Sequence, residues 1–89
     1  MEKTEIEFRG AKFDVNLGAL SSVKVQKALA LAKDDQAKAY WAFDAICCGN
    51  MDEYLDRIPE EDGETSELGA SDEAFAAFME AVAEAAPKN

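Results

Sequence analysis

Apolar and polar residues alternate along residues 4–17, and this period of two predicts β-strands. If the chain reverses at Gly10-Ala11, four large apolar residues share one face of a β-hairpin: Ile6, Phe8, Phe13 and Val15. A two-residue turn with glycine first favours type II′ geometry, which sets the register of the strands. The expected cross-strand pairs are Phe8 with Phe13 and Ile6 with Val15. An isolated hairpin is marginal in water, so its apolar face is expected to pack on the rest of the chain.

Three helices are expected after the hairpin, because apolar residues recur there with a helical period. Residues that cap or stop a helix set the bounds: Ser21 or Ser22 to about Lys33, Gln36 to Cys48 after a cap at Asp34 or Asp35, and Met51 to Ile58 before Pro59. Asn50 and Glu53 have the spacing of a capping box for the third helix. Residues 37–48 contain two polar residues, Lys38 and Asp44, so the second helix is expected to be buried on several sides, by its neighbours or by another chain.

The last third of the chain predicts an acidic loop followed by a helix. Residues 59–70 carry many charges, two glycines and one large apolar residue, Leu68, which favours a loop. Ser71 can cap the helix that follows, and Pro87 stops it. Five apolar residues recur along that helix at i, i+3, i+4, i+7 and i+11: Phe75, Phe78, Met79, Val82 and Ala86.

These elements predict one domain, residues 1–89, of the α+β class and mostly α, with an N-terminal β-hairpin followed by about four helices packed as a small bundle. A chain of 89 residues can bury one modest core but not two. The expected parts are the hairpin at 4–17, a helical region at 21–58, the acidic loop at 59–70 and the C-terminal helix at 71–86.

Charge is distributed unevenly along the chain. Residues 1–50 hold as many acids as bases, whereas residues 51–89 hold twelve acids against Arg57 and Lys88 and so carry the full formal charge of −10. A field of this sign repels nucleic acid and anionic membranes and favours basic partners. Neither direct nucleic-acid binding nor membrane association is therefore expected, although the carboxylates could equally be a solvated surface without a partner. The chain lacks the pattern of a signal peptide, so a cytoplasmic location is expected.

The residue types that commonly carry catalysis are scarce. The chain has no histidine, which removes the usual general base near neutral pH, and no phosphate-binding or nucleophile-elbow motif. Cys47 and Cys48 are adjacent and are expected to be reduced thiols in the core or an interface; they are too few for a zinc site. Glu80 and Glu84, one helical turn apart, fit a solvated helix face better than a catalytic pair. We therefore expect no enzymatic activity, no metal and no cofactor.

Aromatic residues are the strongest indication of a binding surface. Tyr40, Trp41 and Phe43 lie too close together on one helix for all three rings to face a single core, so at least one ring is expected on a second surface. In the C-terminal helix, Phe75, Phe78 and Met79 could close the core or form a docking face, and the core is favoured. These six residues are the candidate protein-binding surface.

The order of these features resembles the small tail assembly chaperones of long-tailed (siphophage-type) bacteriophages. The likeness covers most of the chain and consists of layout, length and acidity. It includes a strand-Arg-Gly-strand opening (EIEFRGAKFDV), an apolar helix ending in CCGN, a short MDEYLDRI helix, the acidic loop EEDGET and a final FAAFMEAVAEAAPKN helix.

The resemblance implies a protein encoded in a phage or prophage tail-gene cluster and acting in the host cytoplasm. Such a chaperone would bind the tape-measure protein, keep it soluble and help tail-tube proteins assemble around it. It would be absent from the finished virion, and some members also occur in a longer frameshifted form. The family offers no invariant site to carry over, and self-association into a homo-oligomer stays open.

Two other classes of function are compatible with the sequence. An acidic inhibitor or nucleic-acid mimic would occupy a basic groove on a host protein, and salt would weaken its binding strongly. An enzyme that uses carboxylates alone would need a pocket in which at least two acids converge.

Overall fold

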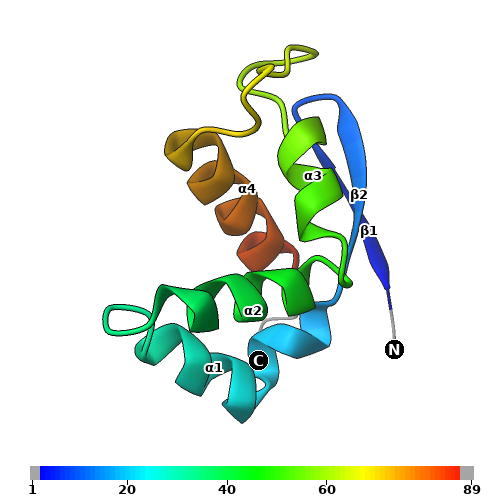
Figure 1. Ribbon diagram of the computed structural model, residues 1–89. Helices are drawn as coiled ribbons and strands as arrows, with labels where there is room; N and C mark the ends of the chain where they lie inside the picture. The colour runs from blue at the N-terminus through cyan, green and yellow to red at the C-terminus, as the bar shows by residue number, and fades with distance from the viewer. Residues whose placement is uncertain (1–2, 87–89) are drawn as a thin grey trace.

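The computed structural model describes residues 3–86, which form a two-stranded antiparallel hairpin followed by four α-helices (Figure 1). The α+β, mostly helical prediction is therefore confirmed. The elements are β1 (Thr4–Phe8), β2 (Ala11–Val15), the 3-10 helix η1 (Leu17–Ser21), α1 (Val23–Ala30), α2 (Gln36–Ile46), α3 (Met51–Arg57) and α4 (Asp72–Ala85). The helix η1 was not predicted. The expected stop at Pro87 and the Lys88-Asn89 end lie outside the described residues.

The hairpin forms at the predicted place, but its register differs from the prediction by two residues. Arg9 and Gly10 make the turn with φ of 49° and 85°, the two positive angles that a type I′ turn requires. Ile6 therefore lies opposite Phe13, and Phe8 opposite Ala11. The predicted pairs and the turn at Gly10-Ala11 are wrong. A shift of two keeps every side chain on its face, so the apolar face is the predicted one.

The unusual backbone of Arg9 is stabilised by a distant loop. The Arg9 guanidinium donates hydrogen bonds to the carbonyl oxygens of Pro59, at 3.2 Å, and of Glu60. The backbone N–H of Gly63 donates in turn to the Arg9 carbonyl at 3.2 Å. A positive φ costs a non-glycine residue roughly 1–2 kcal/mol, and bonds from a charged donor can offset such a cost. The hairpin turn and the acidic loop therefore hold each other in place.

Side chains cap the helices as predicted, with one exception. The Ser22 hydroxyl accepts from the N–H of Val25 at 3.3 Å to begin α1, and Asp35 caps α2. At α3 the expected capping box is wrong, because Asn50 makes no capping bond there. Instead the Asp44 Oδ1, from the last turns of α2, accepts from the N–H of Met51 at 3.0 Å. The end of α2 and the start of α3 are therefore joined through one carboxylate.

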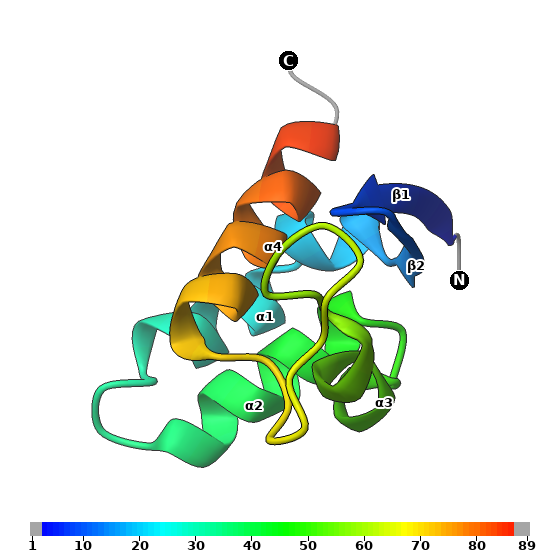
Figure 2. The ribbon, with the colours of Figure 1, turned by 90° about the horizontal axis from the view of Figure 1, so that it is seen from above.

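The acidic loop at 59–70 is tied at both ends and lies at the end of the molecule opposite α1 (Figures 1 and 2). Its chain reverses through hydrogen bonds between Glu60 and Glu64, and the N–H of Ala70 donates to the Leu55 carbonyl at 2.7 Å. The Glu60 carboxylate accepts from the hydroxyl of Ser71 at 2.6 Å and from its N–H at 2.8 Å. Ser71 in turn caps α4 through the N–H of Ala74. The loop thus links the hairpin turn to the start of α4.

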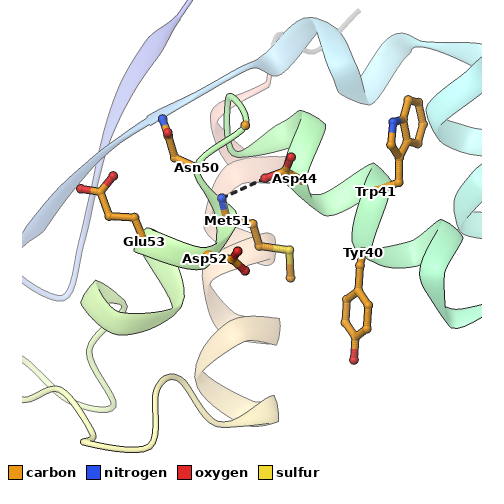
Figure 3. A pocket seen from close by; sticks show the side chains of 8 residues that line it. Tyr40, Trp41, Asp44, Asn50, Met51, Asp52 and Glu53 are labelled. Atoms are coloured by element: carbon orange, nitrogen blue, oxygen red, sulfur yellow. Dashed lines mark hydrogen bonds between the residues drawn. The ribbon is translucent and has the colours of Figure 1, made fainter.

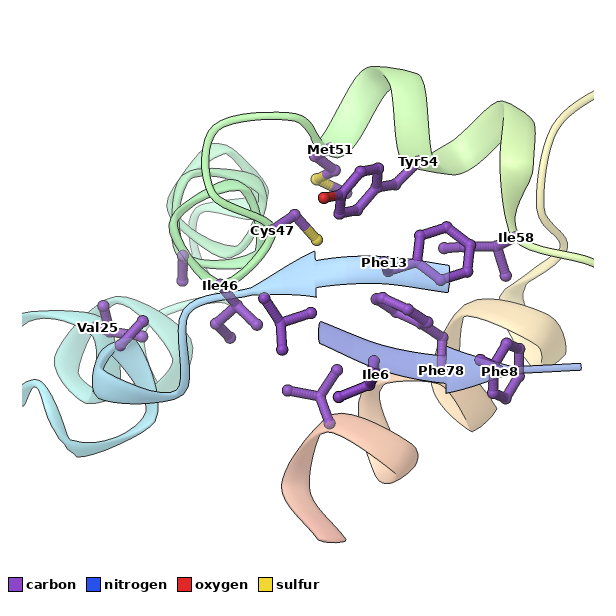
Figure 4. Close-up of a cluster of buried hydrophobic side chains, with 14 of the residues drawn as sticks. Ile6, Phe8, Phe13, Val25, Ile46, Cys47, Met51, Tyr54, Ile58 and Phe78 are labelled. Atoms are coloured by element: carbon purple, nitrogen blue, oxygen red, sulfur yellow. The ribbon is translucent and has the colours of Figure 1, made fainter. Parts of the chain in front are cut away.

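One hydrophobic cluster draws on every strand and helix (Figure 4). At its centre the rings of Phe13 and Phe78 meet edge to face at 4.9 Å between centroids, and Tyr54 packs on Phe13 at 5.1 Å. The Tyr54 hydroxyl donates to the Asp14 carbonyl at 2.7 Å, so the one polar group of this aromatic cluster is satisfied. Both cysteines are free thiols, as predicted, and burial raises the pKa of Cys47 to about 12.

Candidate protein-binding surfaces

The three aromatic residues of α2 point in different directions, as predicted. Successive residues on a helix are about 100° apart, so Tyr40 and Trp41 diverge, and they point to opposite sides of α2 in Figure 3. Tyr40 is 52% exposed and Trp41 is 45% exposed, whereas Phe43 is half-buried. At least one ring was expected on a second surface, and the structure exposes two rings, on different sides of α2.

The C-terminal helix divides its stripe between the core and the surface. Phe78 is completely buried at the centre of the core. It cannot contact a partner, so it is not part of the candidate surface. Phe75 and Met79 are only partly buried and pack against the edge of the core. Sequence spacing treats these three residues alike, because all of them fall on one helical stripe.

Phe43 and Phe75 join α2 to α4 and form the floor of an open groove. Their rings meet edge to face at 5.0 Å between centroids. A hollow of about 450 Å³ lies over them, with a lining that is almost entirely apolar: Phe43, Asp72, Phe75, Ala76, Met79, Glu80 and Ala83. A neighbouring hollow continues the surface to Tyr40, Met51 and Leu55. We call this surface the α2–α4 groove.

The α2–α4 groove brings together four of the six predicted residues: Tyr40, Phe43, Phe75 and Met79. Asp72 and Glu80, both exposed, are the charged residues that line the hollow over Phe43 and Phe75. Leu55, which is half-buried, and Met51, which is buried in the core, were not among the predicted site residues. In the sequence, both residues lie on the apolar side of the short helix, and that pattern predicts packing in the core equally well.

Trp41 lines a different surface, between α2 and α1, and also reaches the hollow between α2 and α3. Six residues line a hollow of about 270 Å³ there: Lys24, Lys27, Ala28, Leu31, Lys38 and Trp41. The Lys24 Nζ lies 5.1 Å from the centroid of the Trp41 ring, within the range of a cation–π interaction. We call this surface the α1–α2 hollow. Its lysines were not among the predicted site residues, although Lys24, Lys27 and Leu31 share one helical face by spacing.

A third hollow lies where α2 meets α3 and contains three acids (Figure 3). The Asp44 carboxylate is occupied as the cap of α3. Asp52 and Glu53 point away from each other in Figure 3, and Glu53 pairs with Arg57 at 3.8 Å. Two of the three acids of this hollow, Asp44 and Glu53, are therefore engaged by other groups of the chain.

Residues 3–86 contain no metal-binding cluster and one carboxylate with an unusual environment. No group of three or more His, Cys, Asp or Glu side chains in that range could hold a metal ion. Over the same residues, every helix is too short or too polar to cross a membrane. Glu80 and Glu84 are both exposed on α4. One carboxylate does have a distinct environment: hydrogen bonds from the hydroxyl and N–H of Ser71 lower the pKa of Glu60.

Comparison with known proteins gives no match, whether to family models, to curated proteins or to solved structures. The likeness to tail assembly chaperones therefore rests on the layout of the sequence alone.

Proposed function

We propose that this chain is a non-catalytic chaperone that binds an apolar helical segment of a client protein in the α2–α4 groove. The observation that carries the proposal is the almost wholly apolar lining of that groove, from Phe43, Phe75 and Met79, on a chain that is otherwise strongly acidic. The half-buried rings of Phe43 and Phe75 and the side chain of Met79 leave apolar surface open to a partner. An aromatic and methionine floor also adapts to more than one client sequence.

Charge indicates the kind of client. Asp72 and Glu80 border the apolar floor, and the second half of the chain carries the full net charge. A helix with an apolar stripe flanked by lysine or arginine would place its charges next to these acids. The remaining carboxylates would keep the complex soluble.

The resemblance gives this activity a biological setting, the assembly of a phage tail. In that setting the client is the tape-measure protein, a long protein with helices that need protection before the tail tube forms around them. The chaperone would act in the cytoplasm of the infected host and would leave before the virion is complete.

Co-expression tests this proposal directly. A tape-measure protein from a phage whose tail-gene cluster encodes this chain is expected to be mostly soluble with the chaperone and mostly aggregated without it. The double variant Phe75→Ala/Met79→Ala should lose that protection, because it removes the floor of the groove. Leu68→Ala is the matched control, since Leu68 is also large and apolar but is 98% exposed on the loop. A client equally soluble with and without this chain would contradict the proposal.

The second candidate is an acidic protein that occupies a basic groove on a host protein. It is favoured by the absence of buried charged residues among those described, which leaves the acids at the surface. Its binding would fall steeply with salt and would not depend on Phe75 or Met79. The same pair of variants therefore separates the two candidates.

A further inference from the structure

The α1–α2 hollow concentrates positive charge on a chain of opposite net charge. Lys24 and Lys27 from α1 and Lys38 from α2 surround a floor made by Ala28, Leu31 and Trp41. The ion pairs among the described residues are Lys12 with Glu5 and Arg57 with Glu53, so none involves these three lysines. Their charge is therefore available to a partner.

The lysines flank the apolar floor from both helices. Lys24, Lys27 and Ala28 follow the spacing i, i+3 and i+4, which places them on one face of α1, and Leu31 follows as the residue that ends the helix. Lys38 and Trp41 are three residues apart on α2 and line the same hollow. A ligand seated here would meet an apolar strip with cations on both sides.

We propose that the α1–α2 hollow is a second docking surface, which binds an acidic amphipathic helix of another protein. An apolar side chain of that helix would contact Leu31 and Trp41, and its flanking carboxylates would pair with the lysines. Tryptophan is a favoured anchor at protein interfaces, and charge of opposite sign selects the partner. The chain would then connect two proteins of opposite charge through the two sides of α2.

Nucleic acid is the other polyanion that such a surface could attract. The net charge of −10 opposes the approach of either polyanion, so the Trp41 ring separates the two: one of its faces is already covered by the Lys24 ammonium. Stacking of a base on that face would have to displace the lysine. An acidic helix needs only the edge of the ring and the lysines as they stand.

Trp41 is the only tryptophan of the chain, so its fluorescence reports on this surface directly. The probes are a synthetic amphipathic helix of leucine and glutamate, the same helix with lysine in place of glutamate, and a single-stranded thymidine oligonucleotide. The glutamate helix is expected to shift the emission of Trp41 saturably, and the shift should weaken as salt is added. The other two probes should leave the emission unchanged at the same concentrations.

Variants identify the cations responsible. The double variant Lys24→Gln/Lys38→Gln should weaken binding of the glutamate helix by about three- to tenfold, because two solvent-exposed charge pairs are lost. Lys12→Gln removes the same charge from the hairpin and should leave the affinity unchanged.

Several results would overturn this second docking surface. They are no saturable shift with the glutamate helix, equal affinity in the Lys24→Gln/Lys38→Gln variant, and equal or tighter binding of the oligonucleotide. An emission shift that depends on protein concentration alone, together with a dimer in sedimentation, would assign the hollow to a second copy of this chain instead. None of these results bears on the α2–α4 groove, which is tested with its own client and its own variants.

Discussion

The two sides of α2 carry similar apolar floors and opposite charges. Towards α4 the floor is Phe43, Phe75 and Met79, and the nearest charges are acids. Towards α1 the floor is Leu31 and Trp41, and the nearest charges are lysines. If both surfaces bind as we propose, apolar area would supply much of the affinity and charge would select the partner. Helix α2 is apolar around most of its circumference because its residues pack into the core and also line both surfaces.

The largest expected effect comes from a residue that supports both sides of α2. Phe78→Ala should destabilise the fold by about 3–5 kcal/mol, because it leaves a cavity against Phe8 and Phe13 at the centre of the core. Both surfaces should then be lost together. Denaturant unfolding followed by circular dichroism and by Trp41 fluorescence checks this, and two separate transitions in the wild-type protein would contradict a common core.

Arg9 provides the next largest effect, and it lines neither surface. Arg9→Ala should cost about 2 kcal/mol, since it removes hydrogen bonds to Pro59 and Glu60 and keeps the unfavourable positive φ. Arg9→Gly loses the same bonds but relieves the backbone, so it should be more stable than Arg9→Ala by roughly 1 kcal/mol. Denaturant unfolding measures both. Equal stability of the two variants would mean that the backbone of Arg9 carries no cost.

Local features of the fold could be predicted from the sequence, and features that depend on distant contacts could not. The caps at Ser22, Asp35 and Ser71 need only neighbouring residues and were predicted. The hairpin register depends on Arg9, whose backbone is held by a loop about fifty residues away. The cap of α3 comes from Asp44 on another helix.

For the candidate surfaces too, local spacing could be predicted from the sequence and contacts between helices could not. The sequence identified the surplus aromatic residues of α2, because their spacing alone excludes a common direction. It could not distinguish Phe78 from Phe75, since one helical stripe contains both the buried and the half-exposed ring. Nor could it bring Lys38 and Trp41 together with Lys24, because that requires the packing of α1 on α2.

A smaller effect should separate the two sides of α2. Phe75→Ala removes a half-buried ring from the α2–α4 groove and should cost about 1–2 kcal/mol, less than Phe78→Ala one turn away. The emission of Trp41 and its response to the glutamate helix should stay unchanged in the folded variant. Titration of that variant with the helix checks this, and a weaker response would mean that the two surfaces are coupled through α2.

The smallest effect depends on pH and concerns the Glu60 carboxylate at the start of α4. Hydrogen bonds from Ser71 lower the pKa of Glu60 in the folded state below its ordinary value of 4.5, so the ionised carboxylate stabilises the fold. This contribution is complete above the pKa of the unfolded chain and is lost as pH falls through the lowered pKa of the folded state. Glu60→Gln should therefore be less stable than the wild-type protein at pH 7, and the difference should shrink as pH falls below 4.5.

Urea unfolding of both proteins at a series of pH values measures this difference. Glu61→Gln is the matched control, because Glu61 lies next in the same loop, is exposed, and makes no side-chain hydrogen bond among those found in the described residues. Its stability difference from the wild-type protein should not change with pH in the same way. A difference for Glu60→Gln that stays constant down to pH 3 would mean that the Glu60 carboxylate does not stabilise the start of α4. In that case the acidic loop would be held by Arg9 and by the backbone hydrogen bond from Ala70 to Leu55.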